Sequence, residues 1–429
     1  MKSFTRILVF YPGFTTLIFA QNLPVTSPEN VGLSSARLQR VEAALNQYVE
    51  KKQIAGAVAL VVRKGKVAYF KSTGMQDIET KKPMPDNTIF RIASMTKPIT
   101  SVAVMMLYEE GRFLLNDPVH KYLPEFKDMM VLNPERATNG QTNAKVDSLV
   151  PAKRPITIRH LLSHTSGLTY HWNEKLGEPY KKAGIAHGLG LHNETLAENM
   201  KKLAKLPLLF HPGDKWEYGL SVDVLGYLVE VVSGKSLNDF FKERIFAPLR
   251  MPDTHFYLPE NKVARLATVY QYSAEKGLAK LPEANSEGSL EFSPAYPYSG
   301  PKKFYAGGAG LCATISDYAR FAQMLLNGGE LEGVRILSRK SVELMTADFA
   351  GGLNPNNGFG LGFGIRRAFP EGGELGSVGA YGWSGFWNTQ FLIDPREQMV
   401  TLIFTQLYPY AAVEVIDKFT VMVYQAVTD

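Results

Sequence analysis

The chain has 429 residues, of which 45% are hydrophobic and 11% aromatic, enough for one large domain or two lobes with a substantial core. Lys and Arg number 47 against 41 Asp and Glu, which gives a formal net charge of +6. The basic residues are scattered, and none form a helix interleaved with aromatic residues, so we expect no nucleic-acid partner.

The first twenty residues have the pattern of an export signal. Lys2 and Arg6 precede an apolar stretch at residues 7–19, and Ala20 stands before the polar Gln21. The stretch is short for a transmembrane helix, which needs roughly 20 residues. We expect a signal peptide at residues 1–20, cleavage near Ala20 and a periplasmic or secreted protein. Retention as an anchor is the alternative, and no other segment is apolar enough to span a bilayer.

The N-terminal part of the remaining chain shows regular hydrophobic periodicity. An amphipathic helix is predicted to start near Ser34. Two strands follow at residues 57–62 and 66–71, and their short connection through Gly65 indicates a hairpin. A second helix, from Ser94 to about residue 110, is apolar on nearly every face, as expected for a helix in the middle of a domain.

Residues 116–300 differ in character, because loops rich in Pro, Asn and Gly separate helical patterns at 158–163, 195–205, 222–233 and 237–247. Beyond them the sequence predicts a helix at 316–326, strands at 386–393 and 399–404, and a last helix at 411–427. The lone Cys312 is expected to be an ordinary buried residue.

These patterns predict an α/β (α+β) fold. Strands near both termini would form one antiparallel sheet flanked by helices, with a mainly helical region inserted between them. The expected lobes are residues 21–115 with 301–429 for the sheet, and 116–300 for the helices. An active site would lie where the two meet.

The motif Ser94-Met95-Thr96-Lys97 is the most informative feature of the chain. Residues three apart on a helical turn face the same way, so the hydroxyl and the amine would lie within reach of each other. The same spacing recurs at Ser273 and Ser299, but only Ser94 begins a buried helix. A serine at a helix start followed by a solvated lysine is the alternative interpretation of the spacing alone.

Two further segments could complete a site. Tyr218 follows Pro212-Gly213 and precedes the helix predicted from residue 222, so its hydroxyl could point from a loop into a cleft. Residues 382–386 precede a predicted strand, and Gly385 would let the backbone approach a ligand closely.

On these motifs the chain resembles the serine β-lactamase-like family, which includes class C β-lactamases, D-alanyl-D-alanine carboxypeptidases and carboxylesterases of the same fold. The resemblance runs over nearly the whole chain beyond the export signal. It rests on segments that recur in one order, at residues 90–97, 161–168, 212–218, 251–256, 307–311 and 358–363.

The resemblance implies roles for individual residues. Ser94 would attack an acyl carbonyl, and Tyr218 would take its proton with help from Lys97, both tuned below their ordinary pKa values near 10. The backbone amides of Ser94 and Phe386 would hold the oxyanion. Water would then release the acyl group.

Departures from the penicillin-recognising pattern indicate the substrate. Leu220 stands where those enzymes have an asparagine, and Trp383 stands where they have a cation for a substrate carboxylate. Both changes favour uncharged esters. We expect the substrate to contact Leu220 and the Trp383-Ser384-Gly385 segment, which resembles the third motif of the family's esterases.

The sequence therefore predicts a carboxylesterase-type serine hydrolase acting on small or medium uncharged acyl esters through a Ser94 acyl-enzyme. β-Lactamase or D-amino-acid peptidase activity at the same site is one alternative, and a non-catalytic protein that binds cell-wall fragments or acts as a scaffold is another. No cofactor is expected. No metal site is expected either, because His160 and His164 lack a carboxylate at the offset that zinc sites use. The oligomeric state stays open.

Overall fold

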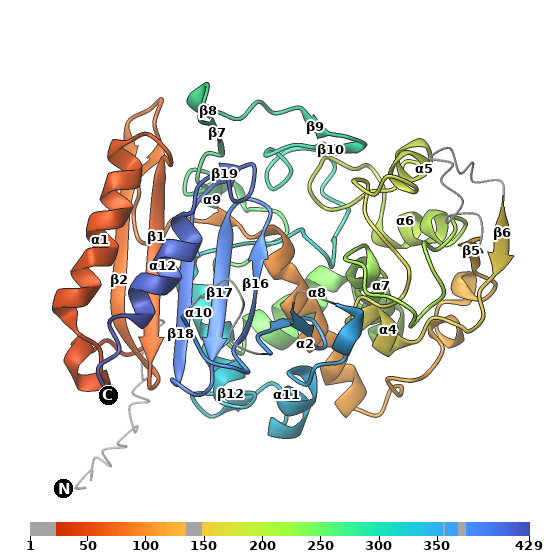
Figure 1. Ribbon diagram of the computed structural model, residues 1–429. Helices are drawn as coiled ribbons and strands as arrows, with labels where there is room; N and C mark the ends of the chain where they lie inside the picture. Colours follow the sequence, from red (N-terminus) through yellow and green to blue (C-terminus); the bar gives the residue numbers. More distant parts are fainter. Residues whose placement is uncertain (1–22, 134–147, 355–356, 368–374) are drawn as a thin grey trace, which may run out of the picture.

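The computed structural model describes residues 23–133, 148–354, 357–367 and 375–429 (Figure 1). The predicted export signal and its cleavage position lie outside these residues. An eight-stranded antiparallel sheet forms the centre of the fold. Its strands, in spatial order, are β14 (Gly358–Phe359), β15 (Gly364–Ile365), β16 (Tyr381–Gly385), β17 (Thr389–Asp394), β18 (Met399–Phe404), β1 (Gly56–Arg63), β2 (Lys66–Asp77) and β3 (Lys82–Pro83).

The sheet joins the two ends of the chain. Strand β1 pairs with its hairpin partner β2 on one side and with β18 on the other. The hairpin turn is made by Lys64 and Gly65, both with positive φ, as a type I′ turn requires. The predicted fold class is confirmed: the strands come from both terminal parts, and helices flank the sheet. The lobe boundaries at residues 115 and 300 stay predictions.

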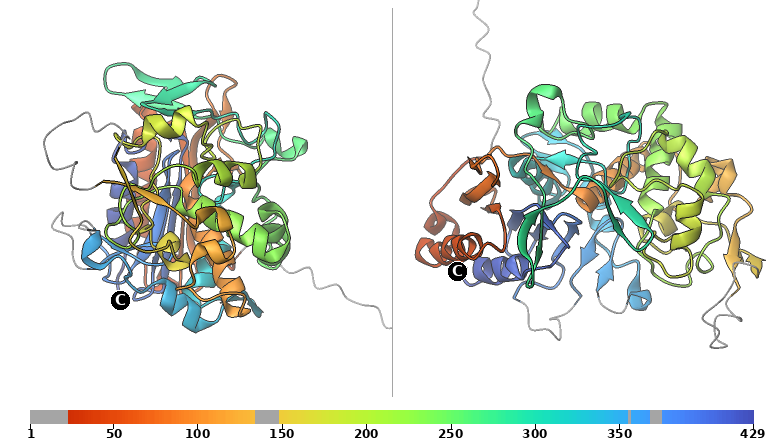
Figure 2. Two further views of the ribbon diagram at one scale, coloured as in Figure 1. Left: turned by 90° about the vertical axis from the view of Figure 1, so that its right-hand side faces the viewer. Right: turned by 90° about the horizontal axis from the view of Figure 1, so that it is seen from above.

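Helices cover the two faces of the sheet, and β1 is buried along its whole length. Successive residues of β1 contribute alternately to two hydrophobic clusters, because strand side chains alternate between faces. One face packs against α1 (Ser35–Glu50) and α12 (Val415–Tyr424), which lie side by side in both figures (Figure 2). The other packs against α10 (Ile315–Leu326).

The helical region is organised around α7 (Ser221–Ser233), which packs against α2, α4, α6 and α8. Besides α1, α7, α10 and α12, the described residues form the α-helices α2 (Thr96–Glu109), α4 (Ile158–Leu162), α5 (Gly177–Lys182), α6 (Leu196–Leu203), α8 (Leu237–Phe241), α9 (Glu260–Val263) and α11 (Arg339–Met345), and a π-helix (Lys242–Phe246). Helix α2 is buried from Thr96 to Leu107. Within the ranges given above, no helix is long and apolar enough to cross a membrane.

Short strands outside the main sheet pair with one another and connect loops. They pair as β4 (Phe90–Arg91) with β11 (Cys312–Ala313), β5 (Met130–Leu132) with β6 (Leu149–Pro151), β9 (Asn285–Glu287) with β10 (Leu290–Phe292), β12 (Glu330–Leu331) with β13 (Val334–Arg335), and β7 (Tyr270–Ser273) with β8 (Gly277–Lys280) and β19 (Leu407–Tyr408). The β4–β11 pair connects the segment before Ser94 to the segment that follows Gly310. Cys312 is fully buried there, as expected.

Two predicted boundaries are wrong. The strand expected at 386–393 starts only at Thr389, and residues 381–385 form a strand of their own. The turn between them closes on Asn388, whose φ is +62° and whose N–H donates to the Gly385 carbonyl. The last helix starts at Val415 rather than near 411, because Ala411 has a left-handed φ of +60°.

Because α12 packs on the sheet, we expect that shortening a buried side chain of this helix lowers the stability of the protein. Phe419 is 1% exposed and lies in the cluster with α1 and the sheet, whereas Val421 on the same helix is 41% exposed. Phe419→Ala should lower the free energy of unfolding by about 3–5 kcal/mol, and Val421→Ala by less than about 0.5 kcal/mol. Urea denaturation measures both, and equal effects would contradict the packing.

Candidate active site

Ser94 lies at the entry to the buried helix α2. It belongs to a 3-10 turn (Ala93–Met95) that leads directly into α2. Ala93 has a φ of +41°, an uncommon value for a residue with a Cβ, and such conformations cluster at functional sites. The side chain of Ser94 is partly exposed although its neighbours are buried. The serine is therefore presented outward by a turn rather than by the regular helix.

Lys97 is 1% exposed, and its amine is surrounded by oxygen atoms. Its Nζ donates to Ser94 Oγ at 3.3 Å, to the Tyr170 hydroxyl at 2.9 Å and to the Gly308 carbonyl at 2.7 Å. Three acceptors match the three N–H groups of an ammonium ion. The predicted proximity of Ser94 and Lys97 is thus present in the structure, with two further partners that come from distant segments.

Tyr218 meets Lys97 in a different way from the one expected. The amine lies over the face of the Tyr218 ring, 4.5 Å from its centroid, and the Tyr218 hydroxyl accepts a hydrogen bond from Trp383 Nε1 at 3.1 Å. Trp383 lies on β16 of the sheet, whereas Tyr218 belongs to the loop before α7. The contact joins the sheet to the helical region, where the site was expected.

Tyr170 is a site residue that the sequence did not reveal. It lies in the loop after α4, is buried, and accepts a hydrogen bond from Lys97. Burial raises the pKa of Tyr170 well above the ordinary tyrosine range, and Asp223 and Tyr218 add to this effect. Tyr170 therefore stays a neutral phenol. In the sequence, Tyr170 could have been suspected only from its position two residues after the motif at 161–168.

His164 supports the loop that carries Tyr218. Its ring centroid lies 4.9 Å from that of Tyr218, and its Nδ1 accepts a hydrogen bond from the Gly219 N–H. Burial, with a contribution from Lys97, lowers the pKa of His164 well below 6.5, so the imidazole is neutral. His164 Nε2 has no hydrogen-bond partner among the described residues.

Gly385 brings the end of β16 against the segment that precedes Ser94. A Cβ at this position would lie 2.4 Å from the Ile92 carbonyl oxygen and 2.3 Å from Thr389 Oγ1, so no side chain fits. Phe386 follows directly, and its ring packs against Phe292. The backbone at 385–386 and the turn that holds Ser94 are therefore in contact.

The residues predicted to contact the substrate differ in their exposure. Leu220 is fully buried in the core at the start of α7, so its side chain does not face a substrate, and its expected binding role is wrong. Trp383 and Ser384 are partly exposed and line a cavity of about 410 Å³ together with Trp216, Phe359 and Arg366. Trp383 connects this cavity to the cluster around Ser94 through its hydrogen bond to Tyr218, although Ser94, Lys97 and Tyr218 do not line the cavity themselves. Trp216 also lines a second cavity, of about 900 Å³.

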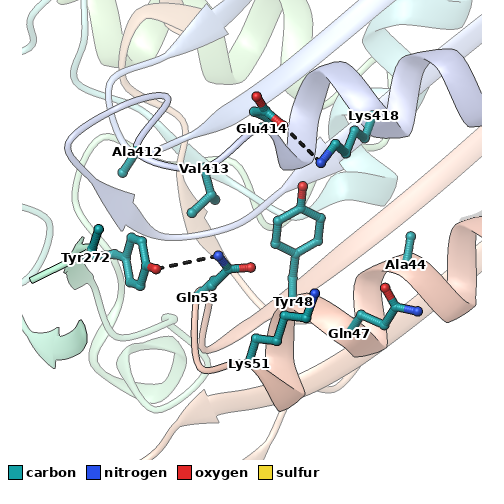
Figure 3. Close-up of a pocket in the computed structure, with 11 residues that line it drawn as sticks. Ala44, Gln47, Tyr48, Lys51, Gln53, Tyr272, Ala412, Val413, Glu414 and Lys418 are labelled. Carbon is teal, nitrogen blue, oxygen red and sulfur yellow. Dashed lines mark hydrogen bonds and ion pairs between the residues drawn. The ribbon is translucent and has the colours of Figure 1, made fainter.

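A third cavity, of about 470 Å³, lies on the α1 and α12 face of the sheet. Figure 3 shows Tyr48 of α1, Tyr272 of β7 and Lys418 of α12 around it. Ser94, Lys97 and Tyr218 are not among its lining residues, so this cavity is separate from the cluster around Ser94.

Known proteins resemble this chain over most of its length. Protein Rv1367c of Mycobacterium tuberculosis is 32% identical over 87% of this chain and 91% of its own length. Esterase EstB of Burkholderia gladioli is 31% identical over 88% of this chain and 93% of EstB. The structure of EstCE1, described as a hydrolase with promiscuous acyltransferase activity, superposes with a TM-score of 0.77 at 28% identity and covers 92% of this chain and 99% of EstCE1. The Beta-lactamase family model matches residues 41–422, and the chain therefore belongs to the Beta-lactamase family of serine hydrolases and acyltransferases.

Proposed function

We propose that the protein is a carboxylesterase that cleaves small or medium uncharged acyl esters through an acyl-enzyme on Ser94. The observation that carries this proposal is the contact of the partly exposed Ser94 Oγ with the buried amine of Lys97, at 3.3 Å. A hydroxyl needs an adjacent base to become a nucleophile, and a buried amine beside it is such a base.

In the proposed mechanism Lys97 reacts as the neutral amine, whose lone pair takes the Ser94 proton while Ser94 Oγ attacks the ester carbonyl carbon. Lys97 makes the direct contact with Ser94, and the Tyr218 ring lies against the amine. The backbone amides of Ser94 and Phe386 stabilise the oxyanion. The proton returns to the leaving alcohol, and water repeats the sequence on the acyl-enzyme. The Tyr218 hydroxyl is held for this relay by the Trp383 indole N–H.

The preference for uncharged esters rests on Trp383. This residue occupies the strand position next to Tyr218 where a cation would be needed to bind a substrate carboxylate. An indole at that position offers an apolar surface instead, and Phe359 and Trp216 extend it. The 31% identity with Esterase EstB over 88% of this chain supports ester hydrolysis as the reaction.

The proposal predicts turnover of short-chain nitrophenyl esters and little or none of a chromogenic cephalosporin. A fluorophosphonate probe should label the wild type, and Ser94→Ala should abolish both labelling and ester hydrolysis. Among the described residues, the other hydroxyl that contacts the Lys97 amine is the buried phenol of Tyr170. Ser273→Ala, at a second Ser-x-x-Lys sequence, is the matched control and should behave as the wild type.

Three results would count against this function. A clear preference for the cephalosporin or for a D-alanyl peptide would favour the β-lactamase or peptidase alternative. Absence of both turnover and labelling in the wild type would favour a binding or scaffold protein. Labelling that persists in Ser94→Ala would assign the nucleophile to another residue.

The proposed oxyanion site predicts the effect of a methyl group at Gly385. Gly385→Ala must displace β16 from Ile92 and with it the Phe386 amide, so kcat should fall by about 10²–10³, the loss expected for one oxyanion donor. Gly352→Ala, where an added Cβ meets no atom within 4 Å, should leave kcat unchanged. Ester hydrolysis tests both variants, with circular dichroism to check folding. An unchanged kcat in Gly385→Ala would remove Phe386 from the mechanism.

Transfer of the acyl group to an alcohol is a second candidate activity, since EstCE1, at 28% identity, is described as having promiscuous acyltransferase activity. The same acyl-enzyme would serve, with an alcohol in place of water. Adding a primary alcohol to a vinyl ester reaction should then yield the exchanged ester in proportion to alcohol concentration. Release of free acid alone, at every alcohol concentration, would restrict the enzyme to hydrolysis.

A further inference from the structure

A buried carboxylate lies next to the catalytic cluster and has no role in the proposed mechanism. Asp223, in the first turn of α7, is 0% exposed. Its Oδ1 accepts a hydrogen bond from the Gly308 N–H at 3.2 Å, and the Gly308 carbonyl accepts one from Lys97 Nζ at 2.7 Å. The backbone of a single glycine therefore connects the carboxylate to the amine.

The second oxygen of this carboxylate is not satisfied by a hydrogen bond. Asp223 Oδ2 has no donor among the described residues, although water does not reach it. A buried charge is costly unless an opposite charge offsets it, and the amine of Lys97 is the charge that does so here. Burial raises the pKa of Asp223 to about 6, and Lys97 and the Gly308 N–H act in the opposite direction.

Position 308 requires a glycine for the contact with Asp223. A Cβ on Gly308 would lie 2.4 Å from Asp223 Oδ2 and 3.1 Å from the Tyr170 hydroxyl, so only glycine lets the three groups approach. In the described part of the chain, the other titratable groups at the amine are Tyr170 and Tyr218, both phenols, and His164, which packs on Tyr218 and is neutral. Asp223 adds a carboxylate to this set, and its charge interacts with that of Lys97.

We propose that Asp223 is a positioning residue whose negative charge, connected through the Gly308 backbone, stabilises the ammonium form of Lys97 and so sets the pH at which Ser94 becomes nucleophilic. The proposal rests on the proposed serine hydrolase function. When Ser94 gives up its proton, Lys97 gains a positive charge in a buried site, and Asp223 balances this charge. No proton moves to the carboxylate.

The variant Asp223→Asn isolates the charge, because an asparagine oxygen can still accept from the Gly308 N–H. The readout is the rate at which a fluorophosphonate forms a bond between Ser94 Oγ and phosphorus, with loss of fluoride, as a function of pH. Removing the negative charge makes the ammonium form of Lys97 less favourable. The midpoint of the labelling curve should therefore move down by on the order of one pH unit.

The maximal labelling rate should fall as well, by about tenfold, because a weaker base accepts the Ser94 proton less readily. The wild-type and Asp223→Asn curves should converge as the pH falls below about 6, where the wild-type carboxylate takes up a proton. Asp317→Asn is the control. It removes another buried carboxylate, whose pKa burial raises to about 7 and which Thr254 and the Asp253 N–H hold away from Lys97. This control should lose stability and keep the wild-type midpoint.

An unshifted midpoint in a folded Asp223→Asn would overturn this role while leaving the esterase proposal intact, whereas a wild type that is never labelled would overturn the esterase proposal itself. If Asp223→Asn does not fold, the pH dependence of labelling in the wild type tests the role of Asp223. A plot of log labelling rate against pH should change slope near pH 6, and a single straight line through that region would refute the role of Asp223.

Discussion

The site depends on one interaction, the placement of the Lys97 amine among three oxygens in a part of the protein that water does not reach. The 3-10 turn that leads into α2 supplies Ser94 and the first turn of α2 supplies Lys97, while the loop after α4 supplies Tyr170 and the segment before β11 supplies Gly308. Burying an ammonium ion is unfavourable unless every N–H finds an acceptor. The amine can therefore occupy this position only when three segments, far apart in the sequence, have assembled around it.

A second set of contacts, among aromatic rings, closes the site from the other side. Tyr218 lies between the Lys97 amine at its ring face and the Trp383 indole N–H at its hydroxyl, so a residue of the helical region is held by the sheet. The His164 ring packs against Tyr218 and accepts a hydrogen bond from the N–H of the following residue, Gly219. The indole N–H of Trp383 thus holds the Tyr218 hydroxyl. Under the proposed function, the same indole also presents an apolar surface to the substrate.

The sequence predicted what local rules determine. The three-residue spacing of Ser94 and Lys97, the hairpin through Gly65 and the fold class all follow from periodicity and turn chemistry within short segments. Tyr170 could not be found this way, because its role comes from a contact with a residue 73 positions away. Asp223 stands out in the sequence as a carboxylate within the apolar run of α7. Its connection to Lys97 could not be predicted, because it depends on the contact with Gly308, which is distant in the sequence. Leu220 was misplaced because position in a motif does not tell which way a side chain faces at a helix start.

The direct test of this account is the crystal structure of the protein after reaction with a fluorophosphonate. The account predicts phosphorus bonded to Ser94 Oγ, a phosphonyl oxygen within hydrogen-bond distance of the Ser94 and Phe386 amides, and Lys97 Nζ still in contact with the modified Oγ, Tyr170 and Gly308. A phosphonyl group on another side chain, or a Lys97 amine turned away from Ser94 into solvent, would contradict it.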